Sequence, residues 1–171
     1  MKSFRQYILE VATDKLIKGK TIHYVHEKLP LGIGTGNHVH NYHIEHPKGG
    51  NYKVSIYTRI VNGKKMSTVH FADPGGHTAR TGKHDLATAS KVLSQVNHVI
   101  GHHVETEDPH GVSFVAEKEK PKPKWQNPNA RPEAYRKMAK RSIGKLGYEY
   151  DEKRSEESKG LMQHYVKKKK K

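Results

Sequence analysis

The sequence contains no cysteine, which excludes a disulfide framework and any metal site built on thiolates. The first twenty residues have no apolar segment of the secretory type, and no run approaches the roughly 20 apolar residues that span a bilayer. Hydrophobic residues make up 33% of the chain, and the mean hydropathy is −0.93. We therefore expect one small core with solvated tails, in an intracellular or virion setting at least as readily as a secreted one.

Acidic residues are also scarce. The chain has 17 Asp and Glu against 32 Lys and Arg, which gives a formal net charge of +15. Such a charge favours a polyanionic partner, and nucleic acid is the obvious one. No membrane partner is expected.

Alternation and turn residues predict the strands. Residues 21–28, 40–46, 52–61, 65–73 and 111–118 read as strands, and a last edge strand is expected at 161–166. Asn62-Gly63 supplies the two positive-φ positions of a type I′ turn, so 52–61 and 65–73 should form an antiparallel hairpin. The glycine-rich stretch 29–37 reads as a connection.

Two amphipathic helices are expected, at 86–104 and at 132–146, the second ending at Gly147. The predicted fold class is α+β, a small antiparallel sheet with a hairpin packed by two amphipathic helices and flexible basic tails. The predicted organisation is a leader and tether at 1–20, a domain at 21–150 with a charged Pro-rich loop at 117–130, and a charged segment with a lysine tail at 151–171.

The 14 histidines suggest metal binding but do not establish it. His38 and His40 point the same way on a strand, and His98 and His102 do so on a helix, yet each pair supplies only two ligands. His46 lies ~20 Å from His40 along an extended strand. His38 and His40 remain weak candidates for a metal site. The preferred interpretation is a polar surface whose charge grows as the pH falls through about 6.5, and no cofactor is assigned.

Catalytic motifs are not supported. The glycines 32, 34 and 36 precede a strand rather than a helix, which argues against a nucleotide-binding loop. His70 and Asp73 could form an acid–base pair, but a hairpin end explains them equally well. The sequence leans against an enzyme and names no catalytic residue.

The basic residues are better organised. We expect phosphate contacts, independent of base sequence, from the second helix and the lysine tail. The predicted nucleic-acid-binding residues are Arg136, Lys137, Lys140, Arg141, Lys145, Lys167, Lys168, Lys169, Lys170 and Lys171.

The opening decapeptide MKSFRQYILE resembles the capsid-targeting leader of the internal head proteins of T-even-like tailed phages. That leader is a short amphipathic segment closed by an apolar-x-Glu signature, here Ile8, Leu9 and Glu10. The resemblance implies cleavage after Glu10 by a prohead protease, contact with the prohead scaffold and a place in the head interior. An ordinary first helix packed on the core is the alternative.

Residues 50–150 resemble a small uncharacterised α+β domain of large tailed phages, which implies an origin but no chemistry. The favoured function is therefore an internal virion protein, packaged with DNA, which it binds non-specifically; injection into the host cytoplasm is a further step that the family implies. The alternative is a small histidine-based enzyme acting on nucleic acid or nucleotide, with or without a metal ion. A third hypothesis is an inhibitor or interaction module against a host protein. Convergence of His38, His40 and His70 with an acidic residue would favour the enzyme.

Overall fold

The computed structural model describes the core of the chain and parts of its ends. The described residues are 9–10, 15–17, 20–22, 24–32, 34–46, 50–72, 86–117, 133, 136–137, 139–158 and 161–170. Among these residues, no helix is long and apolar enough to cross a membrane.

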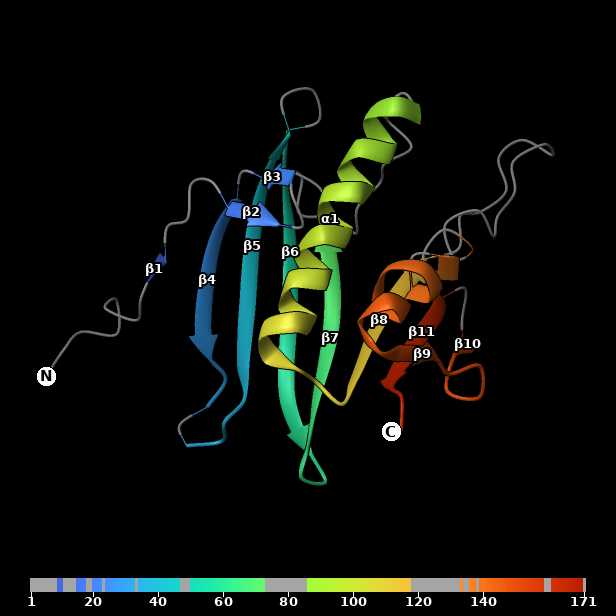
Figure 1. Ribbon diagram of the computed structural model, residues 1–171. Coiled ribbons are helices and arrows are strands. Elements are labelled where there is room, and N and C mark those ends of the chain that lie inside the picture. The colour runs from blue at the N-terminus through green and yellow to red at the C-terminus, as the bar shows by residue number, and fades with distance from the viewer. Residues whose placement is uncertain are drawn as a thin grey trace, which may run out of the picture.

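One nine-stranded mixed sheet dominates the described part, in the order β1-β4-β5-β6-β7-β8-β11-β10 with β9 also paired to β11. Figure 1 shows these strands side by side. Their bounds are β1 Leu9–Glu10, β4 Tyr24–Pro30, β5 His38–His46, β6 Gly50–Val61, β7 Lys64–Ala72, β8 Gly111–Glu117, β9 Tyr148–Tyr150, β10 Glu156–Ser158 and β11 Leu161–Lys168. A separate two-stranded ribbon consists of β2 Lys15–Ile17 and β3 Lys20–Ile22.

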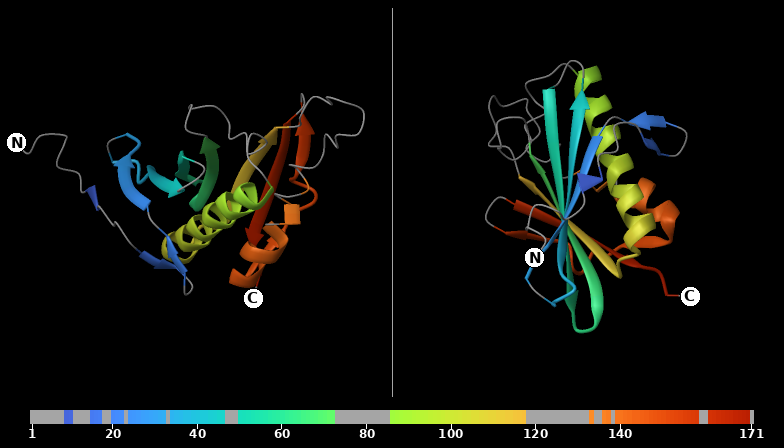
Figure 2. Two further views of the ribbon diagram at one scale, coloured as in Figure 1. Left: turned by 90° about the horizontal axis from the view of Figure 1, so that it is seen from above. Right: turned by 90° about the vertical axis from the view of Figure 1, so that its left-hand side faces the viewer.

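A single long helix, α1 Leu86–Glu107, packs on one face of the sheet. Figure 2 shows it lying along that face, with the short helical segment near residue 140 beside it. The helix presents apolar residues at three- and four-residue spacing, so that one stripe is buried against inward-facing residues of the strands. The buried core includes Tyr42, Ile44, Tyr52, Val54, Ile56, Val69, Val92, Val96, Val99, Ile100, Val112, Phe114 and Val166.

The predicted hairpin is confirmed. β6 and β7 pair antiparallel from Val61↔Lys64 to Lys53↔Ala72. The turn residues have the expected positive φ angles, 51° at Asn62 and 71° at Gly63. Two positive φ values match the right-handed twist of the flanking strands, which is why Asn-Gly is favoured here.

The segment from β7 through α1 to β8 forms a strand–helix–strand unit with parallel strands. Only four residue pairs join the two strands, from Met66↔Gly111 to Val69↔Phe114. Beyond them β7 continues to Ala72 and β8 to Glu117, and the two ribbons diverge toward the end where α1 begins (Figure 1).

The predicted fold class, α+β with a small antiparallel sheet and two amphipathic helices, is wrong. The molecule is richer in sheet, and the sheet is large and mixed because the α1 crossover makes β8 parallel to β7. Only α1 is a long regular α-helix in the described part. Within the second expected helix, the described residues 133, 136 and 137 are α-helical, but residues 139–143 form a π-helical turn and residues 144–146 a 3₁₀ turn.

Three further expectations need comment. The segment 21–28 is divided between β3 and β4 rather than forming one strand. The segment 161–166 belongs to β11, which extends to Lys168 and lies between β8 and β10 instead of at an edge. Gly147 does end the helical segment, with φ 87° in the left-handed region. The predicted loop 117–130 lies outside the described residues apart from Glu117.

Candidate functional site

Two histidines continue the core-facing stripe of β5 toward the start of the strand. Side chains alternate along a strand, so His38 and His40 share a face with Tyr42 and Ile44, which are buried under α1. His40 is 4% exposed and the His38 side chain 12%. Both imidazoles therefore lie between the sheet and the helix, not on an open surface.

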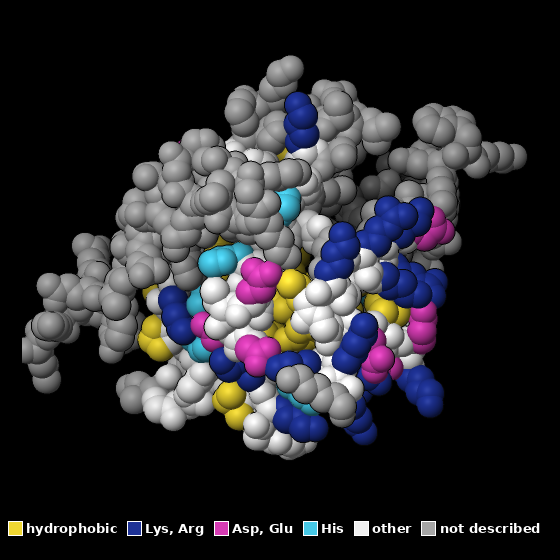
Figure 3. All heavy atoms as spheres, viewed as in Figure 1, with side chains coloured by type: hydrophobic (Ala, Val, Ile, Leu, Met, Phe, Trp, Pro, Cys, Tyr) yellow, Lys and Arg dark blue, Asp and Glu magenta, His cyan; other side chains and the backbone are white. Residues whose placement is uncertain are grey.

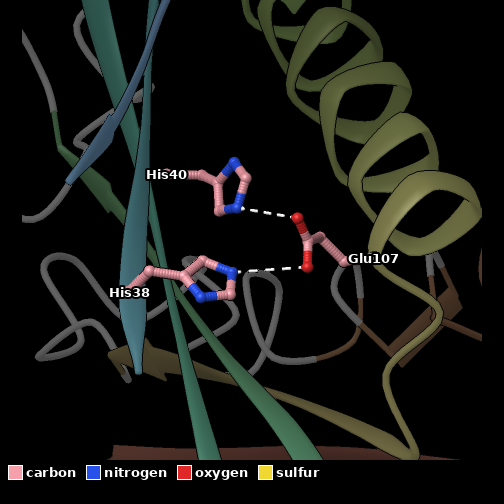
Figure 4. A group of neighbouring side chains, drawn as sticks. All are labelled: His38, His40 and Glu107. Carbon is pink, nitrogen blue, oxygen red and sulfur yellow. Dashed lines mark ion pairs between the residues drawn. The ribbon is translucent and has the colours of Figure 1, made fainter. Parts of the chain in front are cut away.

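The partner of both histidines is Glu107, the last residue of α1. It follows His103 by four residues and so extends the buried stripe of the helix by one turn. His38 Nε2 lies 3.3 Å from Glu107 Oε2, and His40 Nε2 lies 3.2 Å from Oε1. Figure 4 shows the two rings and the carboxylate directed toward one another across the gap between β5 and α1. We call His38, His40 and Glu107 the His–Glu cluster.

The main chain fixes the orientation of one ring. His38 Nδ1 is 3.2 Å from the main-chain oxygen of Gly36, to which it donates. Gly36 is in the left-handed region, with φ 69°. A protonated Nδ1 leaves the lone pair of the neutral imidazole on Nε2, the atom that faces Glu107.

Two lysines reach the same carboxylate from strands on either side of β5. Lys28 Nζ on β4 is 3.1 Å from Glu107 Oε1, and Lys65 Nζ on β7 is 3.2 Å from Oε2. Lys65 also donates to the main-chain oxygen of Glu107 at 2.8 Å, so it caps the carboxyl end of α1. Burial alone would raise the pKa of Glu107, but the hydrogen bonds from both lysines and the nearby charges of Lys28 and His40 lower it to about 2.

A buried polar layer separates the cluster from the apolar core. The His103 ring is fully buried, 4.9 Å from the His40 ring in an edge-on arrangement. Its Nε2 lies 3.1 Å from Ser67 Oγ and 3.5 Å from Thr58 Oγ1, and the two hydroxyl oxygens are 3.1 Å apart. These contacts connect the cluster to β6 and β7 and restrict how His40 can move.

The donor set fits a divalent transition metal. One ligand atom from each of the three residues lies within 4.8 Å of the others. Zinc-type ions bind imidazole nitrogen and carboxylate oxygen at about 2.0–2.2 Å, which places neighbouring ligand atoms of a tetrahedron ~3.4 Å apart. The two histidine–carboxylate separations, 3.3 Å to Oε2 and 3.2 Å to Oε1, are close to that spacing, whereas ligand atoms up to 4.8 Å apart would have to move together on binding. Three protein ligands would leave coordination positions open for water or substrate.

Sequence reasoning found only part of this cluster. It placed His38 and His40 on one face of a strand, and the structure confirms that they lie together. It missed Glu107 and His103, although both extend the apolar helical stripe at four-residue spacing from Val99.

The other histidine candidates lie elsewhere. His70 is exposed, and its ring contacts Tyr57, which is not part of the cluster. His98 and His102 are half-buried on α1, outside the cluster. Asp73, the expected partner of His70, lies outside the described residues.

Four of the predicted DNA-binding cations form ion pairs with nearby carboxylates. Glu152 Oε1 accepts from Arg136 at 2.6 Å and from Lys140 at 2.9 Å. Lys167 pairs with Glu149 and Asp151, and Lys168 pairs with Asp108. Within the described part of the chain, no carboxylate pairs with the exposed cations Lys137, Arg141, Lys145, Lys169 and Lys170. Figure 3 shows Lys and Arg gathered with interspersed acids on the right-hand side. Lys171 lies outside the described residues.

The proposed cleavage signature is only partly described. Leu9 and Glu10 form β1, which pairs with Glu27 and His26 of β4. Ile8 lies outside the described residues. The virion location, the leader, the host-protein partner and DNA binding stay predictions.

No protein-family model matches the sequence, and no curated protein matches it.

Proposed function

We propose that the protein is a metal-dependent enzyme whose divalent transition-metal ion is bound by His38, His40 and Glu107. The observation that carries this proposal is the convergence of two largely enclosed imidazoles and one carboxylate, whose ligand atoms lie within 4.8 Å of one another. The convergence favours the histidine-based enzyme over the packaging role that the leader suggested. His70 does not join the cluster, because its ring contacts Tyr57 on the neighbouring strand. The acidic residue of the cluster is Glu107, the last residue of α1.

The chemistry follows from the donor set. A metal ion with two imidazoles, one carboxylate and open positions acts as a Lewis acid and lowers the pKa of a bound water. The protein's own residues hold this arrangement. Gly36 sets the tautomer of His38, and His103 with its two hydroxyl neighbours limits the movement of His40. The reaction class that fits is hydrolysis, and a phosphate ester of a nucleotide or nucleic acid fits the basic chain.

The lysines set a condition on metal binding. A divalent ion must displace the ammonium groups of Lys28 and Lys65 from the carboxylate, since a protonated amine cannot be a ligand and repels the ion. The two side chains are 51% and 36% exposed, so both can turn toward water. Metal binding also requires neutral imidazoles, so metal affinity should fall as the pH decreases.

Metal titration tests the proposal. Calorimetry with Zn²⁺, Co²⁺ and Mn²⁺ should show one equivalent bound, and metal at about a hundred times its Kd should stabilise the fold by ~2.7 kcal/mol. Replacing His40 with Ala or Glu107 with Gln should weaken binding at least tenfold. His70→Ala is the matched control, because His70 is exposed and outside the cluster. Equal binding by wild type and E107Q, or no saturable binding, would refute the site.

A second candidate function rests on the diverging ends of β7 and β8. Past Val69 and Phe114 the facing edges form no ladder with each other in the described residues. Ligands of open α/β sheets lie outside the carboxyl ends of the parallel strands, and here α1 begins at that same end (Figure 1). Strand edges can bond the amides of an extended ligand, and a helix N-terminus favours phosphate. Coenzyme A combines these groups.

Acetyl-coenzyme A is the probe for this candidate. Binding should protect the amides of residues 70–72 and 115–117 from hydrogen exchange and leave those of β4 and β5 unchanged. Adenosine, which lacks both the amide arm and the phosphates, is the control ligand. Absence of saturable binding, or protection confined to other strands, would exclude this candidate.

A further inference from the structure

The carboxylate of Glu107 is surrounded by four nitrogen groups in a symmetrical arrangement. His40 and Lys28 lie at Oε1, at 3.2 and 3.1 Å. His38 and Lys65 lie at Oε2, at 3.3 and 3.2 Å. The two lysines donate to the carboxylate, one at each oxygen, and each oxygen also faces one imidazole nitrogen. A metal ion bound between the histidines and Glu107 would repel the two ammonium groups, so the lysines must give up their contacts with the carboxylate.

The displaced lysines stay beside the site because their strands hold them there. Lys28 is paired with His40 in the β4–β5 ladder, and Lys65 retains its 2.8 Å hydrogen bond to the main-chain oxygen of Glu107. Both side chains reach solvent, whereas His40 and Glu107 are largely enclosed. The two ammonium groups therefore lie at the solvent side of the ligand atoms, where an incoming molecule meets the site.

Charge then selects the kind of molecule. Glu107 and the two lysines carry a formal charge of +1, and a divalent ion raises this to +3. The next carboxylate along the chain, Asp108, is held by Lys168 at 2.6 Å and does not compensate the site. A strongly charged anion that can bind both a metal and ammonium donors is a phosphate group.

We propose that Lys28 and Lys65 form the phosphate-recognition element of the metal site, so that the substrate presents a phosphate group to the metal between the two ammonium groups. This inference rests on the proposed metal function and assigns the residues that bind the phosphate group of its substrate. The lysines then have two successive partners, Glu107 without metal and the substrate phosphate with metal. They are substrate-binding residues in this arrangement, and the metal ligands are the two histidines and Glu107.

The experiment uses the full chain, Co²⁺ as the metal and inorganic phosphate as the probe. Metal affinity is measured first by calorimetry. Phosphate is then titrated into the Co²⁺-loaded protein at constant ionic strength, and the visible absorption of Co²⁺ reports binding. The variants are K28M, K65M and the double variant, which keep the apolar stems. Lys64→Met is the matched control, because Lys64 is exposed and adjacent to Lys65 but makes no contact with the cluster in the described structure.

The double variant should bind Co²⁺ at least as tightly as wild type, because two competitors for Glu107 are gone, and its phosphate affinity should fall at least tenfold. The single variants should fall between, and K64M should match wild type. Phosphate binding that is absent, or unchanged in K28M and in the double variant, would overturn the inference while leaving the metal site intact. Failure of wild type to bind Co²⁺ would instead overturn the proposed function, and this inference with it. If the double variant does not fold, the same comparison is made with K28M.

Discussion

Replacing Glu107 with Gln should destabilise the metal-free protein substantially at neutral pH. Glutamine keeps the shape of the side chain but removes the charge that both lysines and both histidines face. The folded pKa of Glu107 is about 2, against an ordinary value of 4.5. That difference corresponds to about 3 kcal/mol of favourable interaction for the ionised form. The lysines are partly exposed, and solvent screening reduces the expected loss to roughly 2 kcal/mol.

Urea unfolding of both proteins in the presence of EDTA measures this loss. In thermal unfolding of a domain of this size, the same loss of stability should lower Tm by about 4–8 °C. The pH dependence gives the sign of the effect. Because the folded pKa is depressed, the contribution is present above pH 4.5 and is lost as the pH falls toward 2, so the two proteins should converge there.

A matched control comes from β5. Glu45 is exposed, and Glu45→Gln changes the net charge by the same amount without touching the cluster. A loss in E107Q of less than about 0.5 kcal/mol at pH 7, or one equal to that in E45Q, would show that the carboxylate does not hold the cluster together.

Further predictions concern other parts of the molecule. Burial, with a smaller effect of the Arg136 charge, lowers the pKa of His164 to about 4. The stability of the wild type should therefore fall as the pH drops from 6.5 to 4. Urea unfolding should show that, relative to His164→Phe, the wild type loses up to about 3 kcal/mol over this range. Gly111→Ala should cost about 1–3 kcal/mol in the same assay, because its Cβ would overlap the Tyr165 ring, and an unchanged midpoint would contradict this packing. Changing the cations without acidic partners to Gln should lower the affinity for non-specific DNA and flatten its dependence on salt concentration. Changing the cations that are paired with carboxylates should have a smaller effect, and equal effects of the two sets would refute this distinction. The first set is Lys137, Arg141 and Lys145, and the control set is Arg136 and Lys140. A chain that begins at Val11 should keep its Tm within a few degrees, because β1 contributes only two residue pairs, and mass spectrometry of virions should find that N-terminus if the leader is cleaved.

Local sequence determined the elements whose signals are themselves local. Asn62-Gly63 encoded the β6–β7 turn, because the positive φ angles it requires are a property of those two residues. The apolar spacing of residues 86–104 encoded α1, because burial of one stripe requires that periodicity. The same kind of spacing predicted a regular α-helix over residues 132–146, but residues 139–146 form a π turn followed by a 3₁₀ turn.

The sheet class depended on pairing between distant segments. The longer strands were recognisable from alternation, whereas the short strands β1, β2, β9 and β10 were not predicted. Alternation does not state which neighbour a strand takes or in which direction. β8 became parallel to β7 because α1 returns the chain to the end of the sheet where β7 begins, and β11 became an inner strand because β8 pairs along it. Strand pairing and direction depend on how the whole apolar surface of the sheet is covered, and no short segment of the sequence contains that information.

The His–Glu cluster shows the same division. Alternation along β5 determined that His38 and His40 share a face, and helical spacing determined that Glu107 follows the buried stripe of α1. Only the tertiary structure decided that the two stripes end at the same place, where the strand begins and the helix ends. The ligand spacing, the two lysines at the carboxylate and the lowered pKa of Glu107 exist because side chains from three strands and one helix meet there, and electrostatic interactions depend on distance in space and not on separation along the chain.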